Sequence, residues 1–207
     1  MDLESTIIGR RSVRKFTEEK VPEEFIIKLV KMAIEAPSPG NQQTWHFYAI
    51  MKSDVLQRLA DIVESELDKL TAIGGVNPES MRGPKRFATW FKEAPVVIAA
   101  STRQYRSPVD NTLLRAGYTE EEVDVLRSRP DLQAVGAAIQ NMLLTAYASG
   151  YGACWLTGPL LARKQLEKHL GIQPPESLAA LIALGRPKYN PPRPERKPVD
   201  EFFTLLK

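Results

Sequence analysis

The feature that most constrains the fold is a long uncharged stretch in the second half of the chain. From Leu132 to Ala162, 31 consecutive residues carry no charged side chain. The stretch contains four glycines, Pro159 and several amides, whereas a membrane-spanning helix is predominantly apolar. We therefore expect buried core here, with a helix over 132–149 that is capped by Asp131 and ends at Gly150. A strand over 152–157 should follow it.

The rest of the chain repeats this alternation of helix and strand. The expected helices, which place apolar residues at helical spacing, cover 23–35, 54–70 (capped by Ser53) and 162–170. Thr119 and Glu122 form a capping-box pattern that opens a short acidic helix. The expected strands, which are short apolar runs, cover 45–51, 95–100 and 178–184. We expect a loop or lid at 101–118.

These elements predict one domain of the α+β or α/β class, built on a single central sheet. After Gly185 the chain is rich in proline, which cannot donate a helical hydrogen bond. We therefore expect the C-terminal segment to be an extended arm that lies on a surface.

Composition excludes several classes of protein. With 207 residues, 43% of them hydrophobic, the chain can form a real core and is too apolar for a disordered region. A net charge of +3 argues against a dedicated nucleic-acid binder. Cys154 is the only cysteine, so no intrachain disulfide can form, and the first 20 residues lack the apolar run of a signal peptide. We expect a cytoplasmic protein that binds neither membranes nor nucleic acid.

The familiar catalytic motifs are missing. The run Gly150–Trp155 begins like a dinucleotide-binding turn, but it lacks the third glycine and enters a strand instead of a helix. No phosphate-binding loop, paired-cysteine motif or HExxH motif occurs. The two histidines, His46 (in an expected buried strand) and His169, argue against a Ser-His-Asp triad. Hydrolase, kinase and zinc-enzyme functions are disfavoured, and we expect no metal site.

The positive charge is concentrated near the two ends of the chain. Residues 10–15 and 186–197 together carry a net charge of +8, so the remainder sums to −5. Arginine and hydroxyl groups at 10–15 match the acceptors of a phosphate monoester, although an ordinary solvated basic patch would look the same. We expect both ends to converge on one small phosphate. Arg186, Arg193, Arg196 and Lys197 are candidates for the second contribution.

Two further segments have the residue types of a ligand site. The loop 36–45 combines proline, glycine, Asn41 and glutamines, whose neutral amides suit a polyol or the edge of a heterocycle. It could equally be an ordinary helix-to-strand connection. The strand that ends in Thr157-Gly158-Pro159 offers backbone N–H groups at its C-terminal end. Cys154 and Trp155 are more simply interpreted as core residues.

Together these segments resemble the FMN-dependent nitroreductase family over almost the whole chain. The resemblance rests on five runs in the right order: RRSVRKF, PSPGNQQTWHF, QAVGAAIQNMLLTA, GYGACWLTG, and ALGRP followed by RKPVDE. It implies an α+β fold with a central, mostly antiparallel sheet flanked by helices. It also implies a homodimer that exchanges the arm over 186–207 and binds FMN at the subunit interface.

The resemblance also implies the cofactor-binding residues. The phosphate and ribityl end would be held by Arg10, Arg11, Ser12, Arg14 and Arg196. The other subunit would supply Pro37, Ser38, Asn41 and Gln43. The isoalloxazine ring would be lined by Trp155, Leu156, Thr157 and Gly158. Arg14 could stabilise the reduced flavin, and no side-chain general acid is evident.

The implied activity is NAD(P)H-dependent reduction of nitroaromatic, quinone or similar small acceptors in two steps of hydride transfer. The protein positions the flavin, and the redox chemistry belongs to the cofactor. Segments 68–92 and 103–130 fall where the family varies its substrate covering. Alternatives are a specialised flavoenzyme of the same fold (a reductive dehalogenase, a flavin-fragmenting enzyme or a dehydrogenase) or a flavin-binding module without turnover.

Overall fold

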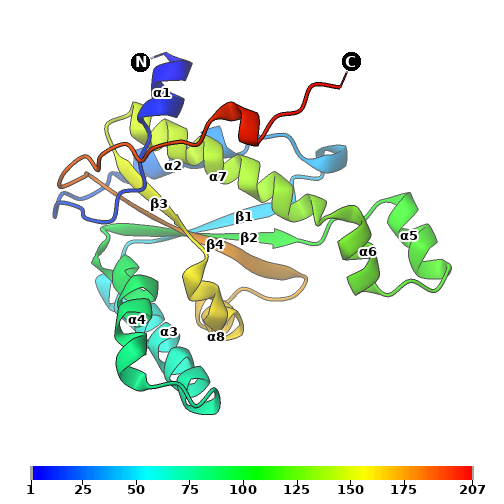
Figure 1. Ribbon diagram of the computed structural model, residues 1–207, viewed down its shortest axis with the longest axis horizontal. Helices are drawn as coiled ribbons and strands as arrows, with labels where there is room; N and C mark the ends of the chain where they lie inside the picture. The colour runs from blue at the N-terminus through cyan, green and yellow to red at the C-terminus, as the bar shows by residue number, and fades with distance from the viewer. Residues whose placement is uncertain (1, 207) are drawn as a thin grey trace.

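A computed structural model describes residues 2–206 of the chain. Its fold is built on one four-stranded antiparallel sheet (Figure 1). The strands are β1 (Trp45–Ile50), β2 (Val96–Arg103), β3 (Gly152–Leu156) and β4 (Glu176–Gly185). Their order across the sheet is β1-β2-β4-β3. The two central strands, β2 and β4, are buried almost throughout because helices cover both faces of the sheet.

Each face of the sheet has its own core. One face packs against α2 (Glu23–Ala33) and α7 (Pro130–Ala148), with Leu29, Ile139 and Met142 buried. The other packs against α3 (Ser53–Ile73), α4 (Arg82–Thr89) and α8 (Arg163–Leu170), with Leu59, Phe91 and Leu166 buried. The remaining helices are α1 (Leu3–Gly9), α5 (Pro108–Arg115) and α6 (Glu120–Arg127). Single 3-10 turns occur at Pro39–Asn41, Pro78–Met81, Trp90–Glu93, Gly158–Ala162 and Val199–Glu201.

The predicted α+β fold with a central antiparallel sheet is confirmed. The uncharged stretch covers α7 from Leu132 onward, β3 and the 3-10 turn at Gly158–Ala162, and α7 lies between the sheet and the C-terminal arm (Figure 1). The capping box at Thr119 and Glu122 is present in full. Within residues 2–206, no helix is both long and apolar enough to span a membrane.

Several local predictions were wrong. Residues 101–118 are not one loop, because β2 continues to Arg103 and α5 follows. Helix α7 begins at Pro130, so Asp131 lies in its first turn instead of capping it. Similarly, Ser53 is the first residue of α3, and Lys52 holds the cap position. His46 is exposed because β1 is an edge strand.

Candidate functional site

The basic segment near the N-terminus runs along the free edge of β3. Ser12 forms a parallel bridge with Ala153, and the backbone N–H of Val13 donates to the Ala153 carbonyl over 3.0 Å. Gly152 allows this approach, since a Cβ there would lie 2.7 Å from Val13. Val13 is buried, which fixes the segment and leaves its basic side chains available at the surface.

The C-terminal arm joins this segment. The N–H of Lys188 donates to the carbonyl of Lys15 over 3.0 Å, and Phe16 forms an antiparallel bridge with Pro187. The arm then continues past the N-terminal segment and encloses a groove of about 370 Å³. Its lining residues are Arg10, Arg11, Ser12, Arg14, Pro191, Pro192, Pro194 and Arg196. The two basic ends of the chain therefore meet in one groove, which contains no carboxylate.

The arginines in and near this groove make different contacts. Arg11 Nη1 donates to the carbonyls of Ile8, Gly9 and Arg10 at 2.7–2.9 Å, so it caps the C-terminal end of α1. Its Nε is buried without a hydrogen-bond partner among the described residues. Arg186 does not line the groove.

Arg186 instead has a structural role. Its guanidinium lies 4.0 Å from the centre of the Tyr151 ring and pairs with Glu19 over 3.2 Å. Neither Arg193 nor Lys197 lines the groove. Of the four C-terminal candidates, only Arg196 does so.

The end of β3 presents a mixture of exposed and buried residues. Trp155 is 39% exposed, and Thr157 and Gly158 are exposed beside it. The Leu156 side chain is buried in the core, so only its backbone is available to a ligand. Burial raises the pKa of the Cys154 thiol, although Arg14, Ser12 and Arg10 oppose that effect. A neutral, buried thiol agrees with the interpretation of Cys154 as a core residue.

The loop between α2 and β1 has an unusual backbone. Gly40, Asn41 and Gln43 all adopt positive φ, at 56°, 50° and 45°. Ser38 Oγ accepts a hydrogen bond from the Gln43 N–H over 3.0 Å and so stabilises the turn. Non-glycine residues in this conformation cost free energy and often occur at functional sites.

This loop lies at the opposite end of α7 from the basic groove. Pro37 and Ser38 line a cavity of about 450 Å³ together with the N-terminal half of α7, at Gln133 and Ala137. The pocket that adjoins the basic groove contacts α7 at Leu143 and Tyr147. A shift of ten residues along a helix corresponds to about 15 Å. The structure thus brings the groove residues together but does not bring the loop residues to them within one chain.

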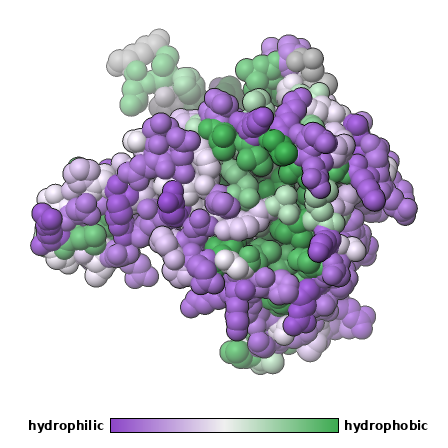
Figure 2. All heavy atoms as spheres, turned by 180° about the vertical axis from the view of Figure 1, so that it is seen from behind, coloured by the Kyte–Doolittle hydropathy of each residue, from purple (hydrophilic) through white to green (hydrophobic). Residues whose placement is uncertain are grey.

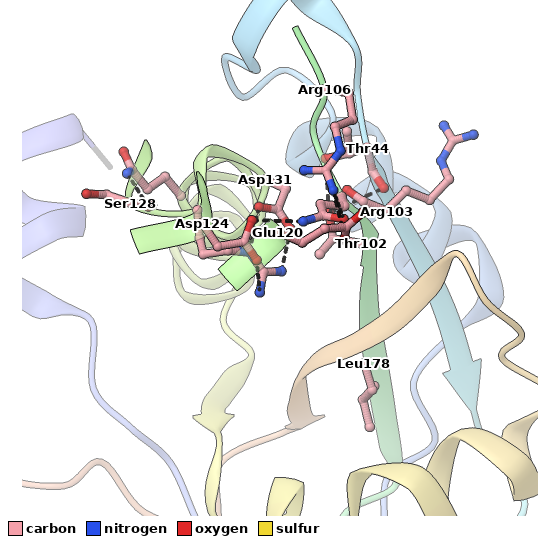
Figure 3. A network of polar contacts seen from close by, with 12 residues as sticks. Thr44, Thr102, Arg103, Arg106, Glu120, Asp124, Ser128, Asp131 and Leu178 are labelled. Atoms are coloured by element: carbon pink, nitrogen blue, oxygen red, sulfur yellow. Dashed lines mark hydrogen bonds and ion pairs between the residues drawn. The ribbon is translucent and has the colours of Figure 1, made fainter. Parts of the chain in front are cut away.

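A polar network holds the α5–α6 segment (residues 104–129) against the start of α7 (Figure 3). Arg129 pairs with Asp131 through two hydrogen bonds, of 3.0 and 2.7 Å, and with Asp124 over 3.5 Å. Hydrogen bonding to Asp131 raises the pKa of Arg129. Ser128 and Arg129 both have positive φ, so the network maintains a strained connection.

A second buried carboxylate anchors α5 to α6. Asp110 is 1% exposed and accepts a hydrogen bond from Arg127 over 3.0 Å. Burial alone raises the pKa of Asp110, but hydrogen bonds from Ser107 and the charge of Arg127 outweigh it, and the pKa is lowered. The carboxylate is therefore charged in the folded protein at neutral pH.

Two contacts connect the predicted covering segments to the candidate site, and sequence reasoning missed both. The Arg14 guanidinium lies 5.6 Å from the centre of the Phe87 ring of α4. Gln42 Nε2 donates to the Arg106 carbonyl over 2.8 Å. The sequence signal that could have pointed to Phe87 is its position as a lone aromatic residue in the polar helix α4. In the structure its side chain is 59% exposed. The described residues contain no cluster of metal-ligating side chains.

Comparison with known proteins identifies the family. The sequence model described as "Nitroreductase family" matches residues 7–186. The chain belongs to the nitroreductase family. Its sequence is 27% identical to the Bacillus subtilis protein YfhC, named as an NAD(P)H nitroreductase, over 99% of this chain and 94% of that protein. An iodotyrosine deiodinase of Hydra vulgaris is 28% identical over 94% of this chain and 69% of that protein.

Similar proteins of known structure have the same fold. A BluB-like flavoprotein from Clostridium difficile superposes with a TM-score of 0.88 at 34% identity and covers 100% of both chains. A nitroreductase from Desulfovibrio desulfuricans, crystallised in complex with FMN, has a TM-score of 0.69 at 27% identity. It covers 100% of this chain and 98% of its own. The nitroreductase-like fold predicted from the sequence is therefore confirmed.

Proposed function

We propose that this protein is an FMN-dependent oxidoreductase that uses NADH or NADPH to reduce nitroaromatic, quinone or similar small acceptors. The observation that supports it best is the basic groove, which Arg10, Arg14 and Arg196 line together with Ser12 and which no carboxylate lines. Guanidinium and hydroxyl donors match the acceptors of a phosphate monoester. Arg11, which also lines the groove, adds a buried donor, because its Nε has no hydrogen-bond partner among residues 2–206.

The donor set fits FMN from its phosphate to its ring. The groove would hold the phosphate, and the adjacent end of β3 would line the ring through Trp155, the Leu156 backbone, Thr157 and Gly158. When bound, FMN supplies two-electron chemistry, accepting a hydride from the nicotinamide and passing electrons to the acceptor in a second half-reaction. Arg14 would supply a positive charge beside the bound cofactor and would favour its reduction.

The loop residues Pro37, Ser38, Asn41 and Gln43 would serve the groove of a second subunit, because they lie at the far end of α7 from their own. Large apolar side chains are also exposed on α1, on α2 and on the arm, among them Ile7, Ile27, Phe202 and Phe203. Figure 2 shows apolar residues gathered on the face turned away from the viewer in Figure 1. Exposed apolar surface of this kind is typical of an interface, and we infer a homodimer that exchanges its C-terminal arms.

Steady-state oxidation of NADH and of NADPH with a nitroaromatic and with a quinone tests this function. We expect turnover with at least one pair and parallel double-reciprocal plots, because donor and acceptor use the same site in turn. Flavin-loaded protein that oxidises neither nucleotide with any of these acceptors would contradict the reductase activity.

A second candidate function is reductive dehalogenation, favoured by the iodotyrosine deiodinases among the relatives. The same assays with an iodinated tyrosine as acceptor separate the two. Iodide release without nitroaromatic or quinone reduction would support the dehalogenase.

A further inference from the structure

A second hollow with cationic lining lies between α3 and α4, which Figure 1 shows side by side below the sheet. It measures about 470 Å³, and none of its lining residues also lines the basic groove. Lys85 and Thr89 each lie two residues from Phe87, which corresponds to about 200° around an α-helix. The hollow is therefore on the side of α4 away from Phe87 and Arg14. Its lining residues are Glu64, Arg82, Lys85, Arg86, Thr89, Trp90, Lys92 and Glu93.

Two of these lining residues, Thr89 and Trp90, are buried, at 7% and 8% exposed. The Thr89 hydroxyl donates to the Lys85 carbonyl over 2.9 Å, so its hydrogen is already used. Trp90 Nε1 is buried and has no hydrogen-bond acceptor among residues 2–206. The Trp90 ring stacks on Phe16, with 6.4 Å between ring centres, and this contact holds the indole in place. An indole N–H can only donate, so the wall of the hollow contains a donor whose acceptor must come from outside the chain.

The charged side chains of the lining differ in whether they are paired. Lys85 pairs with Asp68 of α3, and Arg82 pairs with Glu79 over 2.8 Å. Arg86 and the half-buried Lys92 have no ion-pair partner within residues 2–206. The same holds for the two carboxylates of the lining, Glu64 and Glu93. The hollow thus offers two free cations and two free carboxylates to a ligand.

We propose that this hollow is a second ligand site, separate from the flavin site, for a small phosphorylated compound that carries hydroxyl groups. Lys92 and Arg86 would donate charge-assisted hydrogen bonds to the phosphate. The Trp90 N–H is covered in this conformation, and it becomes a third donor when the long lysine and arginine side chains rearrange around the ligand. Glu64 and Glu93 would accept hydrogen bonds from the hydroxyl groups. The volume lies in the usual range for small-molecule sites.

The first test follows the indole N–H resonances of FMN-loaded, ¹⁵N-labelled protein during titration with glucose 6-phosphate at constant ionic strength. The chain has three tryptophans, and Trp90→Phe identifies the resonance of Trp90. We expect that resonance alone to shift and to saturate, since its N–H gains an acceptor. Glucose, which lacks the phosphate, should cause no shift. An unchanged Trp90 resonance, or a shift confined to Trp155, would overturn the proposal.

Variants then test the phosphate contacts. Lys92→Ala combined with Arg86→Ala should weaken binding of glucose 6-phosphate at least about tenfold, because both free cations are lost. FMN content should stay at the wild-type level, since neither residue lines the basic groove. Arg58→Ala, which removes an exposed cation of α3 outside the hollow, is the matched control and should leave binding unchanged. Wild-type affinity in the double variant would overturn the proposal.

A comparison with inorganic phosphate tests the hydroxyl contacts. Glucose 6-phosphate should bind wild-type protein more tightly than inorganic phosphate does. In a variant with Glu64→Ala and Glu93→Ala this preference should disappear, and inorganic phosphate should bind at least as well as before. Equal affinities of the wild type for the two compounds would overturn the assignment of the carboxylates to hydroxyl groups.

This inference does not rest on the proposed function. A protein that binds no flavin contradicts the proposed function alone. The titration is then made on the variant with Arg10→Ala and Arg196→Ala, in which the basic groove no longer competes for the phosphate, and the same shift of the Trp90 resonance is expected.

Discussion

Replacing both Arg10 and Arg196 by alanine should abolish stable retention of FMN. The two residues come from opposite ends of the chain and line the same groove. A charge-assisted hydrogen bond contributes about 1.5–3 kcal/mol, so each substitution should weaken binding by about 10- to 150-fold. The double variant should lose the product of the two factors if the residues act independently. The dissociation constant is measured by quenching of FMN fluorescence on titration with apoprotein.

Arg193→Ala is the matched control for this prediction. Arg193 is a cation on the same arm but does not line the groove, so its removal should leave FMN affinity almost unchanged. Urea unfolding of the apoproteins separates binding from folding, and the free energy of unfolding should change little because Arg196 is exposed. Wild-type FMN affinity in the double variant would refute the assignment of the groove to the phosphate.

Replacing Arg129 by alanine should destabilise the protein by about 3–5 kcal/mol, the usual cost of leaving a buried charge without its partner. The Asp131 side chain is 1% exposed and receives both of its charged hydrogen bonds from Arg129. Asp124 loses the same partner. Chemical unfolding of wild type and variant at neutral pH measures the change in the free energy of unfolding.

The exposed pair of Arg82 and Glu79 provides the control. Both side chains are more than 60% exposed at 2.8 Å separation, so Arg82→Ala should cost no more than about 1 kcal/mol. Adding Asp131→Ala to Arg129→Ala should recover part of the loss, since it removes the unpaired carboxylate. Equal effects of Arg129→Ala and Arg82→Ala would show that the network contributes little.

Helices and strands were predictable from the sequence where the pattern that specifies them lies within a single segment. The absence of charge from Leu132 through β3 required burial, and the spacing of Thr119 and Glu122 specified a helix start whatever packs around it. Helix ends were less predictable. Asp131 resembles a cap in the sequence, but its carboxylate pairs with Arg129, and the helix begins at Pro130, two residues before the predicted start at 132.

The positive charge of the candidate site was predictable from the sequence, but the contacts of its individual side chains were not. Concentration of positive charge near both ends of the chain indicated one shared anion site, and Arg10 and Arg196 do meet. Arg186 carries the same charge nearby, yet it stacks on Tyr151 and pairs with Glu19. Only the folded chain reveals which guanidinium is already engaged, because the partners are distant in sequence.

The flavin content of the purified protein tests the central claim most directly. Protein purified from cells, or reconstituted with FMN and freed of excess, should be yellow and show the absorbance bands of oxidised flavin. The cofactor released by heat should be FMN, equimolar with the chain. Colourless protein that cannot be reconstituted with FMN would contradict the account.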